Sequence, residues 1–279
     1  MRVYGLIPAR LQSSRLPRKL LLSETGKPLL QYTWEAACRA TSLAGVIIAT
    51  DSPEIVDAVS EFGGRCELTG EHPSGTDRIA EVVRRSCLDA DAVVNIQGDE
   101  PEIDPSNIDA VVAALAADPN SEMATLATPI LDRRQLEDPS CTKVVIAEDG
   151  RALYFSRLPI PFCRDQSVDD VLPTNILTTA PETSESRHGA AGPNELPGRL
   201  TGESPWLLHL GIYAYRRDFL LKLTELPPSR LERLEKLEQL RALEVGATIQ
   251  VATVTDRSVG IDTADDYARF VERRRQDAA

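Results

Sequence analysis

The stretch VYGLIPARLQSSRLPRKLL, residues 3–21, joins an apolar run to a cationic loop. Its first six residues, VYGLIP, are almost all apolar, which predicts a buried strand. The loop that follows has no acidic residue, in a chain with 43 Asp and Glu against 31 Lys and Arg. Its four basic residues are Arg10, Arg15, Arg18 and Lys19. Arg and Lys together suit a polyphosphate ligand; a solvated basic loop is the alternative.

Strand-like and helix-like segments alternate through the first half of the chain. The run GVIIAT at 45–50 precedes the helical pattern at 52–63, and AVVNIQGDE at 92–100 precedes that at 105–118. This alternation predicts an α/β fold, a doubly wound and mostly parallel sheet with helices on both faces. Ligands bind beyond the carboxyl ends of the strands in such sheets. The cationic loop, Asp51 and Asp99 all fall at that edge.

The second half is less regular. Strands are expected at 123–130, 142–147, 152–157, 208–216 and 248–255. A single helix is expected over 229–246, because Ser229 and Glu232 form a capping-box pattern and Gly246 can end the helix. Residues 165–206 are rich in Pro, Gly, Ser, Thr and Glu. This composition predicts a flexible insertion into one domain.

Composition argues against several classes of protein. A formal charge of −12 is unlike that of a general nucleic-acid binder. No apolar run approaches the ~20 residues of a membrane span, and no secretory signal is recognisable, so a cytoplasmic protein is expected. The five cysteines are odd in number and form no C-x-x-C pair, which disfavours zinc and a disulfide framework.

Polar residues at the predicted ligand edge indicate the chemistry. Neither the Walker pattern G-x-x-x-x-G-K-[ST] nor G-x-G-x-x-G follows the first strand, so side chains and backbone would hold the phosphates. Asp99 follows Gly98 at this edge, where a carboxylate facing cations is a natural Mg²⁺ ligand. Asp262 could supply a second carboxylate. HPSGTDR at 72–78 opens a helix at Ser74 or Thr76, whose free amides could bind a nucleotide.

Eight short motifs occur in order along nearly the whole chain: IPAR, ATD, HPSGTDR, QGDEP, YFSR, HLGIYAYR, LEQLR and GIDT. Together they resemble the 3-deoxy-D-manno-octulosonate (Kdo) cytidylyltransferase family, from about Val3 to about Phe270. The resemblance implies a glycosyltransferase-A-like fold and one nucleotidyltransferase domain over residues 1–279. It also implies a homodimer that converts CTP and Kdo to CMP-Kdo and pyrophosphate, for lipopolysaccharide-type glycan synthesis.

The resemblance also implies roles for individual residues. Those that would bind CTP are Pro8, Ala9, Arg10, Arg15, Lys19, Ser74, Gly75, Thr76, Arg78 and Gln97. Those that would carry catalysis are Arg15 and Lys19 on the triphosphate, with Asp99 and Asp262 as Mg²⁺ ligands. Those that would bind the sugar acid are Arg157, His209, Tyr213, Glu235 and Gln239. The spacing of Glu235 and Gln239 would place both on one face of the expected helix.

Three positions depart from the family pattern. Arg18 stands where the family often has Gly, and we interpret it as a solvated extra cation. Leu208 stands where a basic residue is common, and Arg230 where Pro is common; both flank the expected sugar site. Leu208 and Arg230 bear on the exact sugar and not on the nucleotide chemistry. Three alternatives stay open. They are CMP activation of another ulosonic acid (8-amino-Kdo or a sialic-type acid), use of another base or a phosphosugar, and a non-catalytic nucleotide-binding module.

Overall fold

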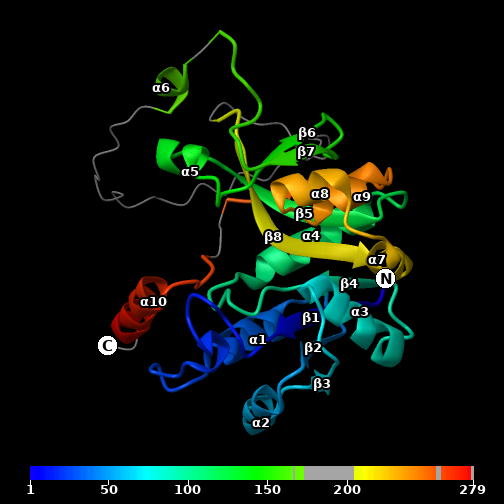
Figure 1. Ribbon diagram of the computed structural model, residues 1–279, viewed down its shortest axis with the longest axis vertical. Coiled ribbons are helices and arrows are strands. Elements are labelled where there is room, and N and C mark those ends of the chain that lie inside the picture. The colour runs from blue at the N-terminus through cyan, green and yellow to red at the C-terminus, as the bar shows by residue number, and fades with distance from the viewer. Residues whose placement is uncertain (166, 173–203, 256–258, 278–279) are drawn as a thin grey trace.

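A mixed sheet of nine strands forms the centre of the part of the chain that the structure describes (Figure 1). The structure is a computed structural model, and it describes residues 1–165, 167–172, 204–255 and 259–277. The strand order is β3-β2-β1-β4-β8-β5-β9, with β6 paired to β8 and β7 paired to β6. Within these ranges no helix is both long and apolar enough to cross a membrane.

The first half of the chain supplies the parallel part of the sheet and the helices beside it. Its elements are β1 (Val3–Ala9), η1 (Lys19–Leu21), α1 (Leu29–Arg39), β2 (Gly45–Thr50), α2 (Pro53–Glu61), β3 (Cys66–Leu68), α3 (Gly75–Ser86), β4 (Ala92–Asn95) and α4 (Pro105–Ala117). β1 pairs in parallel with β2, where Ile7 lies opposite Ile48, and with β4, where Gly5 lies opposite Val94. The carboxyl ends of β1 and β4 therefore meet at one edge of the sheet.

The second half adds antiparallel pairing. Its elements are β5 (Met123–Pro129), α5 (Arg133–Glu137), β6 (Lys143–Ile146), β7 (Ala152–Ser156), α6 (Val168–Val171), β8 (Leu207–Arg216), α7 (Arg217–Glu225), α8 (Arg230–Glu235), α9 (Gln239–Glu244), β9 (Ile249–Thr253) and α10 (Ala264–Asp277). β8 lies antiparallel between β4 and β5, whereas β5 and β9 are parallel. This long strand joins the two halves into one sheet (Figure 1).

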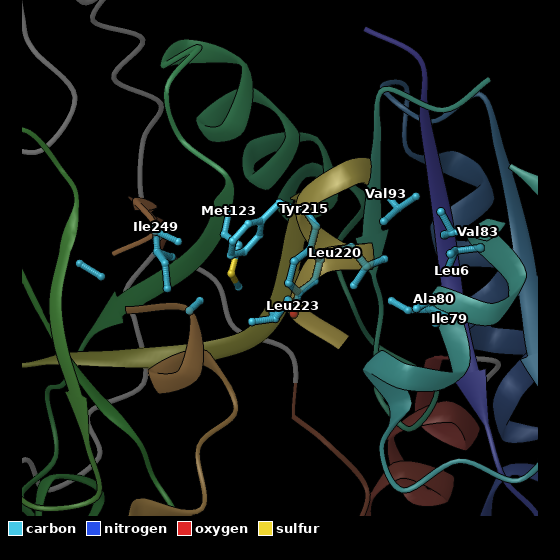
Figure 2. Packing of buried hydrophobic residues seen from close by; sticks show 14 of the residues in the cluster. Leu6, Ile79, Ala80, Val83, Val93, Met123, Tyr215, Leu220, Leu223 and Ile249 are labelled. Carbon is cyan, nitrogen blue, oxygen red and sulfur yellow. The ribbon is translucent and has the colours of Figure 1, made fainter. Parts of the chain in front are cut away.

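Both faces of the sheet are buried, which explains the nearly continuous apolar strands. Leu6 of β1 packs in one cluster with Ile79 of α3 and Leu220 of α7; Figure 2 shows part of it. Ile7, the next residue of β1, packs in a second cluster against Ile55 of α2 and other residues of α1 and α4. Successive side chains of a strand point to opposite faces, so each core takes alternate residues. The predicted α/β architecture with helices on both faces is confirmed, but the sheet is mixed and not mostly parallel, because β6, β7 and β8 pair antiparallel.

The sequence predictions for the strands are confirmed, and the expected helix at 229–246 is wrong in one respect. The Ser229–Glu232 capping box is present, and Gly246 has a positive φ of 81° at the end of α9. Between α8 and α9, however, Lys236 adopts a left-handed conformation with φ 56°. Leucine at every third position cannot keep to one face of a straight helix. The break lets Leu237 and Leu240 enter the core while Leu234 stays exposed.

The ends of the predicted insertion at 165–206 pack as part of the fold. Ser167 caps the short helix α6 in a capping box. Leu172 and Trp206 are buried in one cluster with Ile130, and the indole Nε1 of Trp206 donates to the carbonyl of Pro161 at 3.0 Å. The predicted boundaries were therefore too wide at these two ends. The rest of the predicted insertion, 166 and 173–203, lies outside the described residues.

Candidate active site

A cleft of about 850 Å³ opens beyond the carboxyl ends of β1 and β4. Nearly all residues expected to bind CTP or metal line it: Pro8, Ala9, Arg10, Arg15, Lys19, Ser74, Gly75, Arg78, Gln97, Asp99 and Asp262. Among the expected nucleotide residues, Thr76 does not line it. Arg18 does not line it either, and pairs with Glu54 on the exposed side of the loop. Its exposed position agrees with the interpretation of Arg18 as a solvated extra cation.

Two glycines allow the walls of the cleft to approach β1 closely. A Cβ on Gly98 would lie 3.3 Å from the Cγ2 of Ile7, and one on Gly75 would lie 3.1 Å from the Cγ of Pro8. Contacts this short leave little room for any side chain. The close approach brings Asp99 and the start of α3 to the end of β1, where the cationic loop begins.

The ammonium of Lys19 lies among three oxygens at the floor of the cleft. Its Nζ is 2.5 Å from Oδ2 of Asp99, 3.0 Å from Oδ1 of Asp262 and 3.0 Å from the carbonyl of Ile261. Burial alone would lower the pKa of Lys19, but the two carboxylates outweigh it and the pKa is raised. Arg15 pairs with Oδ2 of Asp262 at 2.9 Å. The loop cations and the two carboxylates thus meet at one point.

This arrangement suits a hard divalent cation. Two carboxylates and a carbonyl already surround one positive charge, and Mg²⁺ prefers oxygen ligands. Within the described ranges no three His, Cys, Asp or Glu side chains cluster as a complete metal site. A Mg²⁺ ion here would therefore complete its coordination with substrate phosphates and water, as is common for this ion.

The start of α3 forms one wall of the cleft. Ser74 caps the helix, accepting from the amide of Asp77 at 3.1 Å. Arg78, buried in the first turn, donates to Oδ2 of Asp51 and to Oγ1 of Thr69, both at 2.7 Å. Its guanidinium therefore holds the ends of neighbouring segments together beneath the cleft. The sequence predicts Asp51 at the ligand-binding edge of the sheet, and in the structure its carboxylate holds Arg78 in position.

Sequence reasoning missed His72 and Glu238, which also line the cleft. The Nε2 of His72 lies 2.6 Å from Oε2 of Glu81, an oxygen that also accepts from the amide of Gly70 at 3.0 Å. The hydrogen bond with His72 is the main cause of a lowered pKa of Glu81. The HPSGTDR motif could have pointed to His72. The LEQLR motif likewise contains Glu238, but the straight-helix prediction drew attention to Glu235 and Gln239 instead.

None of the expected sugar residues is among those that line the cleft, although Gln239 lines the small cavity next to it. Glu235 ends α8, and its carboxylate accepts from Oγ of Ser156 at 2.7 Å and from the amide of Arg157 at 3.0 Å. The guanidinium of Arg157 donates to the carbonyls of Glu235, Pro139 and Lys236. Both side chains thus hold α8 against β7 in this structure. The argument that Glu235 and Gln239 share one helical face is wrong, because the break at Lys236 separates them.

His209 and Tyr213 point from β8 toward the core that contains Phe155. The centre of the His209 ring lies 5.1 Å from that of Phe155, in an edge-to-face arrangement, and 5.3 Å from that of Tyr213. Its Nε2 lies 2.9 Å from Oγ1 of Thr125, a hydroxyl that is 2.7 Å from the carbonyl of Ile212. The same hydroxyl lies 3.1 Å from the carbonyl of Leu210, so Thr125 connects the His209 ring to the backbone of β8. Burial lowers the pKa of His209 to about 3, so the ring is neutral.

Thr76 connects the nucleotide wall to the start of α9. Its Oγ1 donates to Oε2 of Glu238 at 2.6 Å. Both residues, with Tyr215, Gln239 and Arg241, line a small cavity next to the cleft. Glu238 lines the cleft as well as this cavity, and Gln239 is buried with its amide nitrogen unpaired among the described residues. Thr76 thus holds Glu238, the acidic residue just before α9 that lines the cleft.

Comparisons with known proteins agree with this geometry. Residues 4–249 match a family model described as Cytidylyltransferase. The 3-deoxy-manno-octulosonate cytidylyltransferase of Rhodopirellula baltica is 44% identical over 274 residues, covering 98% of each chain. The protein of the same name from Syntrophobacter fumaroxidans is 45% identical over 280 residues, covering 100% of this chain and 99% of its own.

Solved structures give the same relationship. A CMP:2-keto-3-deoxy-manno-octonic acid synthetase complexed with CTP superposes with a TM-score of 0.81 and 35% identity, over 99% of this chain and 100% of that chain. A cytidylyltransferase from Leptospira borgpetersenii shares the fold alone, with a TM-score of 0.56 and 16% identity over 97% of this chain and 85% of its own. This protein therefore belongs to the 3-deoxy-manno-octulosonate cytidylyltransferase family.

Proposed function

We propose that this protein transfers CMP from CTP to Kdo, giving CMP-Kdo and pyrophosphate. The observation that carries the proposal is the cleft in which a cationic loop meets Asp99 and Asp262. It is supported by the relatives of that name and by the CTP complex of the similar synthetase. We also propose that the enzyme is cytoplasmic. In the described ranges no helix could cross a membrane.

The chain's own cations would hold and neutralise the triphosphate. Arg10 and Arg15 are exposed at the cleft mouth, where their guanidinium forks can reach phosphate oxygens. Lys19 lies deeper, 13% exposed, beside the carboxylates. Backbone at Pro8 and Ala9 and the capped start of α3 would face the nucleoside. Phosphoryl transfer needs mainly such positioning and charge neutralisation.

In the reaction, the C2 hydroxyl oxygen of Kdo would attack the α-phosphorus of CTP in line with the departing pyrophosphate. Asp99 and Asp262 would hold Mg²⁺, which would neutralise phosphate charge and lower the pKa of the attacking hydroxyl. Arg15 and Lys19 would stabilise the charge that develops on pyrophosphate. No side chain of the cleft is assigned as a strong base.

The sugar acid would bind on the α9 side of the cleft. Glu238 can accept hydrogen bonds from sugar hydroxyls, and Gln97 borders the same space while donating to the carbonyl of Gly211 at 3.1 Å. We assign Glu238 to the contact expected of Glu235. Arg157 and Gln239 would then support this wall from behind, because Arg157 donates to backbone carbonyls and Gln239 is buried. His209 and Tyr213 are only half-buried on β8, and they remain proposed contacts of the sugar acid.

We further infer a homodimer. Leu158 and Phe162, just after β7, are 70% and 88% exposed, although both are large and apolar. A second copy of the chain is the occupant we propose for this surface. Analytical ultracentrifugation of the wild type and of the double variant Leu158→Ser/Phe162→Ser tests this interface. A dimeric wild type and a monomeric variant would support it, whereas the same mass for both proteins would refute it.

The decisive experiment combines purified protein, CTP, Mg²⁺ and Kdo, with pyrophosphate release and the mass of the product as readouts. Replacing Kdo by 8-amino-Kdo or a sialic acid measures the choice of sugar. Replacing CTP by ATP, GTP or UTP measures the choice of base. Turnover that persists equally in EDTA would reject the metal assignment. Binding of CTP without turnover of any acid would show a non-catalytic nucleotide-binding module instead.

A further inference from the structure

The position of Lys19 in the cleft is unusual for a residue that is assigned to a triphosphate. Its ammonium lies within hydrogen-bonding distance of Asp99, Asp262 and the Ile261 carbonyl, residues 80 to 243 positions away in the chain. These three oxygens belong to two segments, one after β4 and one before α10.

We propose that Lys19 is a built-in cation that occupies the divalent-metal position in the nucleotide-free enzyme, and that it must leave this position before the metal can bind. This inference rests on the proposed assignment of a divalent cation to Asp99 and Asp262. It adds an exclusive exchange: the same oxygens bind either the ammonium or the metal. Once displaced, Lys19 is free to contact the triphosphate.

The contacts make the two cations mutually exclusive. An ammonium at 2.5 to 3.0 Å from three oxygens fills the space between them. A divalent ion using the same oxygens at its shorter coordination distances would lie within a few ångströms of Nζ, with no anion between the two positive charges. Like charges at that separation repel strongly in a partly buried site, so one of them must move away.

Lys19 can move, because only its long side chain has to swing. It belongs to η1, a single short turn of three residues, and a lysine stem has four rotatable carbons. While it lies there, the ammonium holds together two carboxylates that would otherwise repel each other. It thereby connects the segment after β4 to the segment before α10.

Arg15 provides an internal comparison. It pairs with the other oxygen of Asp262, Oδ2, at 2.9 Å, and its side chain is 64% exposed against 13% for Lys19. Arg15 thus neutralises the same carboxylate from outside and does not contact Asp99. Removal of either residue deletes one positive charge next to Asp262. Only removal of Lys19 opens the space between the oxygens.

The consequence is that a free divalent cation binds the nucleotide-free enzyme weakly. CTP supplies phosphate oxygens that can take over the Lys19 ammonium, and so releases the carboxylates for the metal. By linkage, nucleotide and metal then favour each other's binding. The carboxylates would be protected from wrong cations until the nucleotide arrives.

The test measures binding of MnCl₂ to full-length, nucleotide-free protein by electron paramagnetic resonance of the free ion. We expect Lys19→Met to bind Mn²⁺ at least about tenfold more tightly than the wild type, which is ~1.4 kcal/mol. Arg15→Met should stay within about threefold of the wild type. Lys19→Gln, which keeps a polar side chain, is a second variant in case Lys19→Met does not fold. Thermal melts in EDTA and in MnCl₂ add a readout of folding, with a larger Mn²⁺-induced rise in Tm for the Lys19 variants.

Two results would overturn the proposal. One is a Mn²⁺ affinity of the folded Lys19 variants equal to that of the wild type. The other is an equal gain in Arg15→Met, which would reduce the effect to net charge. Because no substrate is present, the outcome is separate from the proposed function: a gain confined to Lys19 stands even if the protein fails to make CMP-Kdo.

Discussion

The hydroxyl of Thr76, in the first turn of α3, donates a 2.6 Å hydrogen bond to the carboxylate of Glu238, 162 residues later at the start of α9. One side of this contact belongs to the helix that would face the nucleoside. The other belongs to the wall that would face the sugar acid. A single short hydrogen bond therefore fixes the spacing between the two proposed substrate positions.

Replacing Thr76 by Val should damage use of the sugar and spare the nucleotide. Valine keeps the shape but cannot donate to Glu238, and a hydrogen bond to a charged group contributes about 1.5–3 kcal/mol. We expect the KM for Kdo to rise about tenfold while the Kd of CTP, measured by calorimetry, changes less than about twofold. Thr76→Ser retains the hydroxyl and should restore most of the loss. A rise in the CTP Kd alone would place Thr76 in the nucleotide pocket instead.

Replacing Glu235 by Ala should act on stability. Its carboxylate accepts from Ser156 and from the amide of Arg157, so its loss would leave these donors without their partner at the junction of β7 and α8. Such losses cost about 1–3 kcal/mol each. We expect a clearly lower midpoint in urea, with the Kdo KM of the folded protein within about threefold of the wild type. Glu238→Ala is the matched variant and should show a smaller loss of stability, because only the Thr76 hydroxyl loses its partner, together with a raised Kdo KM.

Local chemistry explains which parts of the structure were predictable. The caps at Ser74 and Ser229 were predicted because each depends on residues three positions away, and both are present. The apolar strands were predictable because both faces of the sheet are covered. The loop cations and Asp99 could be assigned to one edge because parallel strands share their carboxyl ends.

Long-range packing explains what was missed. The break at Lys236 arises because Leu237 and Leu240 enter the core, and a window of local sequence does not contain that core. The antiparallel course of β8 between β4 and β5 likewise depends on partners far away in the chain. Thr76 was predicted correctly at the start of a helix, but its partner lies 162 residues away.

The low pKa of His209 predicts a dependence of stability on pH. Burial lowers its folded pKa from 6.5 to about 3, so only the unfolded chain takes up this proton between those values. The contribution is therefore complete above about pH 6.5 and is lost as the pH falls, by up to about 1.4 kcal/mol per pH unit. Urea unfolding at pH 7.5, 6.5 and 5.5 should show a steeper decline for the wild type than for His209→Gln. Parallel declines in both proteins would contradict the lowered pKa of His209.

Asp99→Asn and Asp262→Asn should each reduce kcat by roughly a hundredfold or more, the scale of losing one preorganised electrostatic group. Each change replaces one of the two carboxylates that are proposed to hold the metal by a neutral amide. In EDTA the same variants should bind CTP at least as well as the wild type, because Lys19 loses a carboxylate partner and its ammonium becomes free for phosphate oxygens. Asp265→Asn, an equal charge change on the exposed first turn of α10, is the control and should leave kcat within about twofold. Near-wild-type turnover in either of the first two variants would show that its carboxylate is not a ligand. Weaker CTP binding in EDTA would show that these carboxylates help to hold the nucleotide without a metal.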